Sequence, residues 1–248
     1  MSPSAAQRPP RPRLSVIIPA LDEAAQIAAL LGDLQALRQP DSPLGRSELI
    51  VVDGGSRDAT AAIAEPLVDR LLHSARGRAR QMNAGAAAAR GQWLWFVHAD
   101  SRVDAALLDQ LDAAIGSDAR WGRFDVRLSG DAALLRLIEW AMNRRSRFTA
   151  MATGDQGIFV RRADFAAAGG YPEIALMEDL ALSKSLRRRA RPACLRGPLL
   201  TSSRRWERHG VLRTMLLMWR LRLAWFFGAD PARLARRYRA GDGEAAGG

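Results

Sequence analysis

The segment Leu49-Ile50-Val51-Val52-Asp53-Gly54-Gly55-Ser56 sets the architecture of this chain, because four apolar residues stop at an acid and a glycine turn. A short apolar run of this kind predicts a buried strand. Two further runs have the same character, Leu14–Ile18 and Trp93–Val97. Apolar residues at three- and four-residue steps, or Ala-rich stretches, predict helices over residues 27–37, 59–65, 78–90 and 104–115. This alternation predicts an α/β fold with a mostly parallel, Rossmann-like sheet and helices on both faces.

The second half of the chain is less regular. Residues 123–128 and 157–160 predict strands, and residues 132–143 and 180–189 predict helices. Glu178 and Asp179 come just before the last of these helices, where negative charges suit the helix N-terminus.

The net charge of +11 over 248 residues is concentrated at one end of the chain. Residues 1–180 are close to neutral, whereas residues 181–248 contain 16 basic and 4 acidic side chains. A basic end beside apolar residues fits an anionic membrane surface at least as well as a nucleic acid. The single cysteine, Cys194, excludes a disulfide scaffold and indicates a reducing compartment, so we expect a cytoplasmic protein.

Two of the predicted strands lead to an acid, Asp53 and Asp100. Because ligands bind beyond the carboxyl ends of parallel strands, we expect both carboxylates to face one crevice. The alternative for each acid is that it caps a turn or a helix. The loop after the first strand, Pro19–Glu23, contains no glycine, which excludes the phosphate-binding loops of NAD enzymes and P-loop NTPases.

The motifs also follow one another in a characteristic order. They are Ser15–Glu23 (SVIIPALDE), Val51–Thr60 (VVDGGSRDAT), Arg78–Gly85, His98-Ala99-Asp100, Gly154–Arg162, Gly169–Tyr171, Glu178-Asp179 and Arg204-Arg205-Trp206. Over residues 14–206 the chain resembles the small stand-alone bacterial members of glycosyltransferase family 2, which have the GT-A fold. The resemblance implies an inverting transfer of a hexose from a nucleotide-sugar, with UDP favoured as the nucleotide.

The same resemblance implies which residues hold the nucleotide. Asp53 is similar to the acid that reads uracil, and the residues expected to line the base slot are Pro19, Ala20, Leu21 and Glu23. A diphosphate leaving group needs its negative charge neutralised by guanidinium groups and a hard cation. Arg76 and Arg80 are the expected phosphate partners.

The expected cofactor is Mg²⁺ or Mn²⁺, with Mn²⁺ slightly favoured. Asp100 is the carboxylate expected to bind the metal. Many members of the family have D-x-D where this chain has His98-Ala99-Asp100. His98 can hold Mn²⁺ through a ring nitrogen but is a poor ligand for Mg²⁺, so either Asp100 suffices or the metal dependence is altered.

Inversion needs one in-line attack by an acceptor hydroxyl and one carboxylate base. Asp179 resembles that base, with Glu178 beside it. Gly154, Asp155 and Gln156 are expected to meet the sugar, the alternative being a capped turn. Arg204, Arg205 and Trp206 resemble a shortened Q-x-x-R-W motif that lacks its Gln; they are expected to contact acceptor or phosphate, or else to form an Arg–Trp stack.

The chain divides into four expected parts: a disordered tail at 1–13 without the apolar segment of a signal peptide, a GT-A domain at 14–206, a basic, aromatic-rich helical appendage at 207–240, and a flexible tail at 241–248. Residues 211–227 are too short and too charged to span a membrane. This segment predicts a helix that lies in the membrane–water interface at the inner face of the cell membrane. The alternative is a helix that packs on the GT-A domain or across a dimer. A lipid-like or membrane-associated acceptor is therefore expected.

Two other classes of protein stay open at this stage. One is a catalytically impaired nucleotide-sugar or membrane-binding protein on a glycosyltransferase scaffold, which the departure at His98 favours. The other is a nucleic-acid binder, which would show strongly salt-dependent binding.

Overall fold

The computed structural model describes residues 11–39, 42 and 45–241, and the predicted tails at 1–13 and 241–248 lie mostly outside them. The described residues form one sheet of seven strands, which are β1 (Leu14–Ala20), β2 (Ser47–Asp53), β3 (Arg70–His73), β4 (Trp93–Phe96), β5 (Trp121–Leu128), β6 (Phe159–Arg161) and β7 (Ala193–Thr201). The strand order is β3-β2-β1-β4-β6-β5-β7. Of these strands only β6 runs antiparallel to its neighbours, which confirms the predicted mostly parallel sheet.

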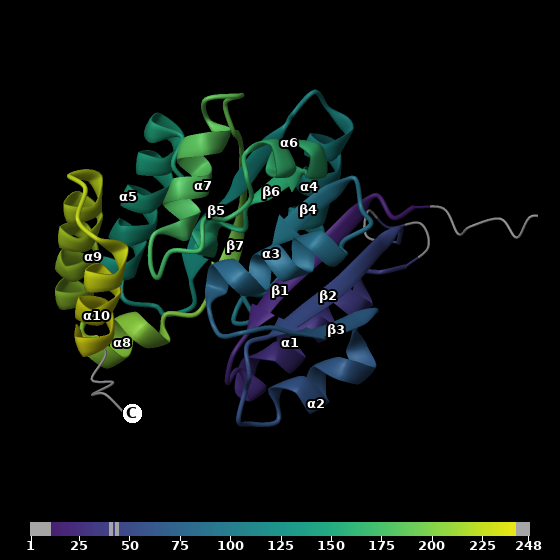
Figure 1. The fold of residues 1–248 in the computed structure, drawn as a ribbon, viewed down its shortest axis with the longest axis horizontal. Helices are drawn as coiled ribbons and strands as arrows, with labels where there is room; N and C mark the ends of the chain where they lie inside the picture. Colours follow the sequence, from purple (N-terminus) through teal and green to yellow (C-terminus); the bar gives the residue numbers. More distant parts are fainter. Residues whose placement is uncertain (1–10, 40–41, 43–44, 242–248) are drawn as a thin grey trace, which may run out of the picture.

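Helices cover both faces of this sheet (Figure 1). They are α1 (Ala24–Ala36), α2 (Thr60–Ala64), α3 (Arg78–Ala88), α4 (Ala105–Gly116), α5 (Ala133–Thr149), α6 (Arg162–Ala167), α7 (Glu178–Leu186), α8 (Arg204–His209), α9 (Val211–Phe226) and α10 (Pro231–Gly241), with 3₁₀ turns η1 (Glu65–Leu67) and η2 (Gly154–Gln156).

Different helices close the two faces of the sheet. Val16 and Ile18 of β1 point into a core shared with α1 and α4. Ile17, between them, points into a second core shared with α3, α6 and α7. Successive strand residues face opposite sides, and here both sides are buried, which is why the strand is a continuous apolar run rather than an alternating one.

The edge where the central parallel strands end is also set by the register. Ala20 of β1 pairs with Asp53 of β2, and β4 ends at Phe96, opposite Ile17 of β1. The loops that follow these strands therefore leave the sheet on the same side. This edge receives the functional residues described below.

β7 and α5 are among the elements that differ from the sequence predictions. β7 is a strand that the sequence did not indicate, because Arg196-Gly197-Pro198 interrupts its apolar residues and its pairing with β5 shifts at Phe124/Asp125. α5 runs to Thr149, six residues beyond the predicted end, because the polar residues after Asn143 form its exposed side and its contacts with the sheet.

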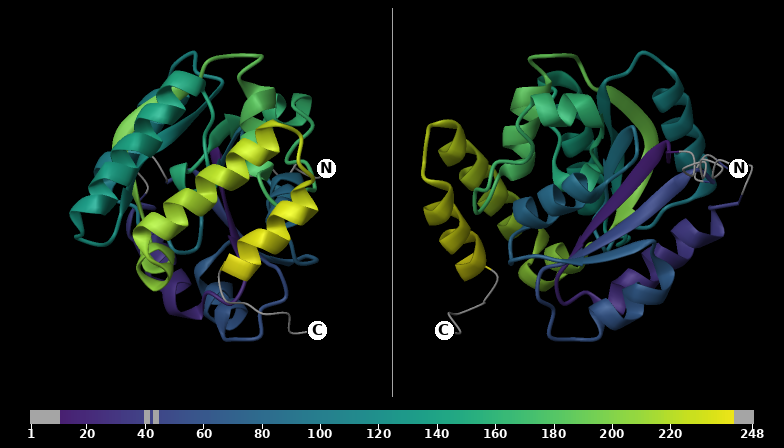
Figure 2. Two further views of the ribbon diagram at one scale, coloured as in Figure 1. Left: turned by 90° about the vertical axis from the view of Figure 1, so that its left-hand side faces the viewer. Right: turned by 45° about the vertical axis from the view of Figure 1, so that its right-hand side comes forward.

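The three C-terminal helices pack against the sheet domain (Figure 2). On one side, Val211 and Met215 of α9 contact a cluster with β5 and α5. On the other side, Leu221 of α9 and Leu234 of α10 pack beside Met177 and the start of α7. No helix among the described residues is long and apolar enough to cross a bilayer.

α9 shows an unusual distribution of its side chains. Every third or fourth residue of one stripe is large, apolar and exposed: Leu212, Leu216, Trp219, Leu223 and Phe226. Arg222 lies on another side of the helix and lines a cavity. The sequence indicates no clean amphipathic stripe here, and the structure shows why: the exposed stripe is apolar while a cation faces inward.

Candidate active site

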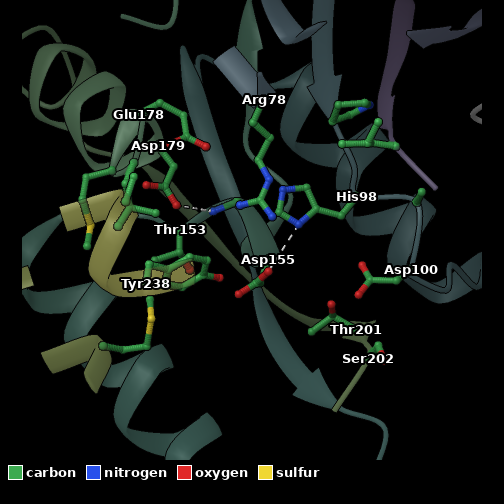
Figure 3. Close-up of a pocket in the computed structure, with 18 of the residues that line it drawn as sticks. Arg78, His98, Asp100, Thr153, Asp155, Glu178, Asp179, Thr201, Ser202 and Tyr238 are labelled. Carbon is green, nitrogen blue, oxygen red and sulfur yellow. Dashed lines mark hydrogen bonds and ion pairs between the residues drawn. The ribbon is translucent and has the colours of Figure 1, made fainter. Parts of the chain in front are cut away.

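A cavity of about 510 Å³ opens at the carboxyl edge of the central strands (Figure 3). Its walls come from the loops after β1 and β4, the N-terminal turns of α3 and α7, the turn η2, and the C-terminal helices. Three acids separated widely along the chain, Asp100, Asp155 and Asp179, line this one cavity. Residues 214–238 close part of its wall, so α9 and α10 belong to the site and are more than an attachment to it.

Asp179 is held by backbone donors at the start of α7. Its Oδ2 accepts a hydrogen bond from Gly154 N–H of η2 at 2.8 Å, and its Oδ1 accepts one from Leu180 N–H at 2.7 Å. Met177, just before α7, has φ +71°, a left-handed conformation that is rare for a residue with a long side chain. This bend directs Glu178 and Asp179 toward the cavity (Figure 3).

His98 and Asp155 both line the cavity, and their side chains form a close polar contact. His98 Nδ1 lies 3.3 Å from Asp155 Oδ1. Gly154 makes room for the ring, because a Cβ at that position would lie 2.5 Å from His98 Nε2. Burial alone would raise the pKa of Asp155, but the hydrogen bond and charge of His98, with Arg78 and Arg222, lower it to about 2. Asp155 is therefore an anion at every pH of interest.

Arg78 occupies the centre of the site, between these acids (Figure 3). Burial by itself would lower the pKa of its guanidinium, but Glu178, Asp155 and Asp179 raise it. A sequence search for phosphate partners picks Arg76 and Arg80 and misses this residue. Gly77, with φ +142° just before α3, sets the direction of the first helical turn and brings Arg78 inward.

Glu178 is nearly buried beside Asp179. Burial and the charge of Asp179 raise the pKa of Glu178, and Arg78 opposes this rise. The fold therefore disfavours the charged form of Glu178.

Asp100 lies at the other end of the cavity, close to Thr201 and Ser202 (Figure 3). Burial raises its pKa, and the charge of Asp155 adds to this, while His98 and Arg204 act in the opposite direction. Burial raises the pKa of Glu23, and the charge of Asp100 raises it further. Excess negative charge therefore gathers at this end.

The donor atoms at this end fit a divalent cation. Within the part of the chain that the structure describes, no three His, Cys, Asp or Glu side chains group as a complete metal site. Asp100, however, accepts no hydrogen bond from the described residues. Mg²⁺ and similar cations are commonly held by one or two carboxylates together with substrate phosphates and water. His98 directs its Nδ1 to Asp155, so Asp100 is the better ligand of the predicted pair.

Several predicted site residues come together in the cavity. Those that line it are Pro19, Ala20, Leu21, Glu23, Arg76, His98, Asp100, Gly154, Asp155, Glu178, Asp179 and Trp206. Arg204 lies at the margin, where its Nη2 is 3.3 Å from Glu23 Oε2. Arg205 belongs to α8, and its side chain is outside the described part of the chain.

Besides Arg204 at the margin, three predicted site residues with described side chains do not line the cavity. Asp53 is 3% exposed and accepts hydrogen bonds from Gly55 N–H and Ser56 N–H, so its carboxylate serves its own turn. Arg80 points outward and pairs with Glu173. Gln156 is fully buried, where its Nε2 donates to Ser146 Oγ at 2.9 Å. As arranged here, Asp53 and Gln156 follow the alternative in which a polar residue stabilises a turn.

The comparison with known proteins identifies the family. The profile of Glycosyl transferase family 2 matches residues 15–168, more than half of the chain, and the chain therefore belongs to this family. The PGL/p-HBAD biosynthesis glycosyltransferase of Mycobacterium bovis (strain BCG / Pasteur 1173P2) is 34% identical over 176 residues. The match covers 64% of this chain and 63% of that protein, so the chain spans less than two thirds of the length of this relative.

Solved structures share the fold. The Staphylococcus aureus TarS fragment 1–349 in complex with UDP-GlcNAc has a TM-score of 0.60 at 20% identity, covering 77% of this chain and 58% of that one. The mannosyltransferase PcManGT from Pyrobaculum calidifontis in complex with GDP-Man and Mn²⁺ has a TM-score of 0.62 at 19% identity, covering 93% and 70%. At this identity the likeness concerns the fold, and it confirms the predicted GT-A fold.

Replacing Glu178 with Gln is expected to stabilise the protein at neutral pH. Because the pKa of Glu178 is raised from 4.5 in the fold, its stabilising contribution is complete below pH 4.5 and is lost as the pH rises through the raised value. The neutral amide avoids this loss. We expect Glu178→Gln to unfold with a free energy about 1 kcal/mol above wild type at pH 7, with the difference vanishing below pH 4.5.

Urea denaturation at several pH values measures this difference. Glu173→Gln is the matched control, because Glu173 is exposed and its pair with Arg80 contributes little to stability. A Glu178→Gln protein that is less stable than wild type at pH 7 would show that the charged form is favoured in the fold.

Proposed function

We propose that this protein is an inverting glycosyltransferase that moves a hexose from a UDP-sugar to a hydroxyl of a membrane-associated acceptor. The observation that carries the proposal is the single cavity that holds Asp100 at one end and Asp179 at the other, with Arg78 between them. The carboxylate of Asp100 and the guanidinium of Arg78 suit a diphosphate leaving group with its cation. The carboxylate of Asp179 suits an attacking hydroxyl that must lose its proton.

The donor end supports binding of a nucleoside diphosphate. Pro19, Ala20 and Leu21 form an apolar wall that suits a base. Arg78 supplies a positive charge to the diphosphate oxygens as the glycosidic bond breaks. A divalent cation held by Asp100 and the diphosphate would neutralise the remaining negative charge. The crystal of TarS contains UDP-GlcNAc and that of PcManGT contains GDP-Man, so the choice of UDP here rests on the sequence resemblance.

The acceptor end supports general-base chemistry. Asp179 Oδ2 is fixed by Gly154 N–H, and its carboxylate faces the cavity. It takes the proton of the acceptor hydroxyl while that oxygen forms a bond to the anomeric carbon. The bond from the anomeric carbon to the phosphate oxygen breaks on the opposite side, and the nucleoside diphosphate leaves. One displacement of this kind inverts the configuration.

The surface beside the cavity supports an acceptor at a membrane. Every large hydrophobic side chain that is exposed in the described part of the chain belongs to α5, to α9 or to Phe227 after it. On α5 these are Leu137, Trp140 and Phe148, and Arg144 lies 5.3 Å from the Trp140 ring and 5.4 Å from the Phe148 ring. Apolar and aromatic side chains with neighbouring arginines are typical of an interfacial surface on anionic lipid.

Replacing Asp179 with Asn should abolish turnover while leaving nucleotide binding unchanged. The amide oxygen still accepts the Gly154 hydrogen bond, but the amide cannot take a proton, and a general base contributes about 10²–10⁴ in rate. Release of UDP or GDP from a panel of nucleotide-sugars, in the presence of acceptor membranes and Mn²⁺, measures turnover. Calorimetric titration with UDP measures binding.

The matched control is Asp109→Asn, an exposed carboxylate on α4 that should keep full activity. Full turnover by Asp179→Asn would refute the assignment of the base. If wild type binds UDP but releases it from none of the donors, the alternative of a nucleotide-sugar-binding protein gains support.

Replacing Trp219 and Phe226 together with Ser should weaken binding to anionic vesicles by more than about tenfold, because two aromatic anchors are lost. Both side chains are exposed, so the fold should be preserved. Flotation with phosphatidylglycerol vesicles measures binding. The control Arg57→Ser lies in the loop before α2, a helix at the far end of the molecule from α9 (Figure 1). Equal flotation of the double variant and wild type would refute the membrane surface.

A further inference from the structure

Two arginines from different helices are found at the cavity wall: Arg222 of α9 lines the cavity, and Arg145 lies about one helical turn after Met142, which also lines it. Arg145 of α5 does not line the cavity itself; burial lowers the pKa of its guanidinium, and the charge of Arg222 lowers it further. These helices are far apart in the sequence, and their packing brings the two guanidinium groups together.

Both guanidinium groups have buried nitrogens without partners. Among the residues that the structure describes, Arg145 Nε and Nη2 and Arg222 Nε are buried and donate no hydrogen bond. Within the described part of the chain, the Arg145 guanidinium makes one hydrogen bond, from Nη1 to Met151 O at 3.3 Å. A buried donor left unsatisfied is costly, and it is most costly when it is charged.

The charges of this pair are also incompletely balanced. Burial lowers the pKa of Arg145 to about 10, and Arg222 adds to that effect. The charge of Asp179 opposes this lowering, but the Asp179 oxygens already accept hydrogen bonds from Gly154 N–H and Leu180 N–H. The two guanidinium groups therefore have N–H groups that Asp179 does not bind. A second anion could accept hydrogen bonds from them.

We propose that Arg145 and Arg222 bind an anionic group, a phosphate or a carboxylate, of the acceptor. This inference rests on the proposed transferase function and narrows its acceptor class. Guanidinium groups bind phosphate and carboxylate through paired N–H donors. An acceptor held in this way presents its hydroxyl beside Asp179.

The position of the pair separates it from the donor diphosphate. The charges that act most strongly on Asp100 come from His98, Asp155, Arg204 and Arg78. Those that act most strongly on Arg222 among the described side chains come from Asp179 and Asp155. Arg145 and Arg222 are thus coupled to the charge of Asp179, whereas Asp100, the carboxylate that fits the metal and diphosphate, is coupled to His98, Asp155, Arg204 and Arg78.

The test is calorimetric titration of the full chain with glycerol 3-phosphate, in the absence and in the presence of saturating UDP and Mn²⁺. We expect wild type to bind this phosphate ester under both conditions. Arg222→Met and Arg145→Met should each bind at least about tenfold more weakly, because each loses a charged donor. Arg220→Met, an exposed arginine on the same helix, should bind as wild type does.

Arg222→Lys adds a check against a purely structural effect. It keeps the charge and the methylene stem, and we expect partial loss because an ammonium cannot form the paired hydrogen bonds. Lysophosphatidic acid, the same headgroup on an acyl chain, distinguishes the sources. If the lipid binds more tightly than glycerol 3-phosphate, the acceptor is a lipid. If the two bind equally, the acceptor is a soluble phosphate ester. In both cases Arg222→Met must bind the ligand more weakly than wild type does.

Two results would overturn the inference. One is glycerol 3-phosphate binding that Arg222→Met and Arg145→Met leave unchanged. The other is binding that disappears once UDP and Mn²⁺ are present, because the ester would then occupy the diphosphate position. Failure of UDP itself to bind would count against the proposed donor instead, and the titrations without UDP would still decide whether the arginine pair binds phosphate.

Discussion

The contact on which this site depends is the hydrogen bond from Gly154 N–H to Asp179. It ties the turn η2 to the first turn of α7 at 2.8 Å. The next residue in the turn, Asp155, is paired with His98 after β4. One short turn therefore fixes two carboxylates and one imidazole from three parts of the chain. Only glycine fits at position 154, because the imidazole occupies the space that a Cβ would take.

The C-terminal helices extend this site beyond the sheet domain. α9 exposes an apolar stripe and turns Arg222 inward, the reverse of what a surface helix of a protein in water normally does. A membrane-bound acceptor would explain both the exposed apolar stripe and the inward position of Arg222. The apolar stripe then meets lipid, and the inward arginine meets the polar part of the acceptor.

Some of the site could be predicted from the sequence because it depends on strand ends and ordered motifs. Asp100 follows a strand whose apolar pattern is clear, Asp179 comes at the start of a predicted helix, and both line the cavity. Asp53 satisfies the same sequence criterion, yet the amides of its own turn bind its carboxylate. Charge and position alone do not show which acid has a free oxygen.

Arg78 and Arg222 line the cavity, but the sequence alone does not identify either of them as a site residue. Arg76, Arg78 and Arg80 alternate along the chain, yet Arg76 and Arg78 line the cavity while Arg80 pairs with Glu173. The sequence does contain a signal for Arg222, since a helical projection places it opposite Arg213 and Arg220. That signal gains meaning only when the packing of α9 between α5 and α10 is known.

The most direct test of the central claim, that this cavity receives a nucleoside diphosphate at Asp100, is calorimetric titration of wild type and Asp100→Asn with UDP in the presence of Mn²⁺. The account predicts that wild type binds UDP and that the variant binds about tenfold or more weakly, because it lacks the charged carboxylate that fits the cation. Equal binding by the two proteins would contradict it.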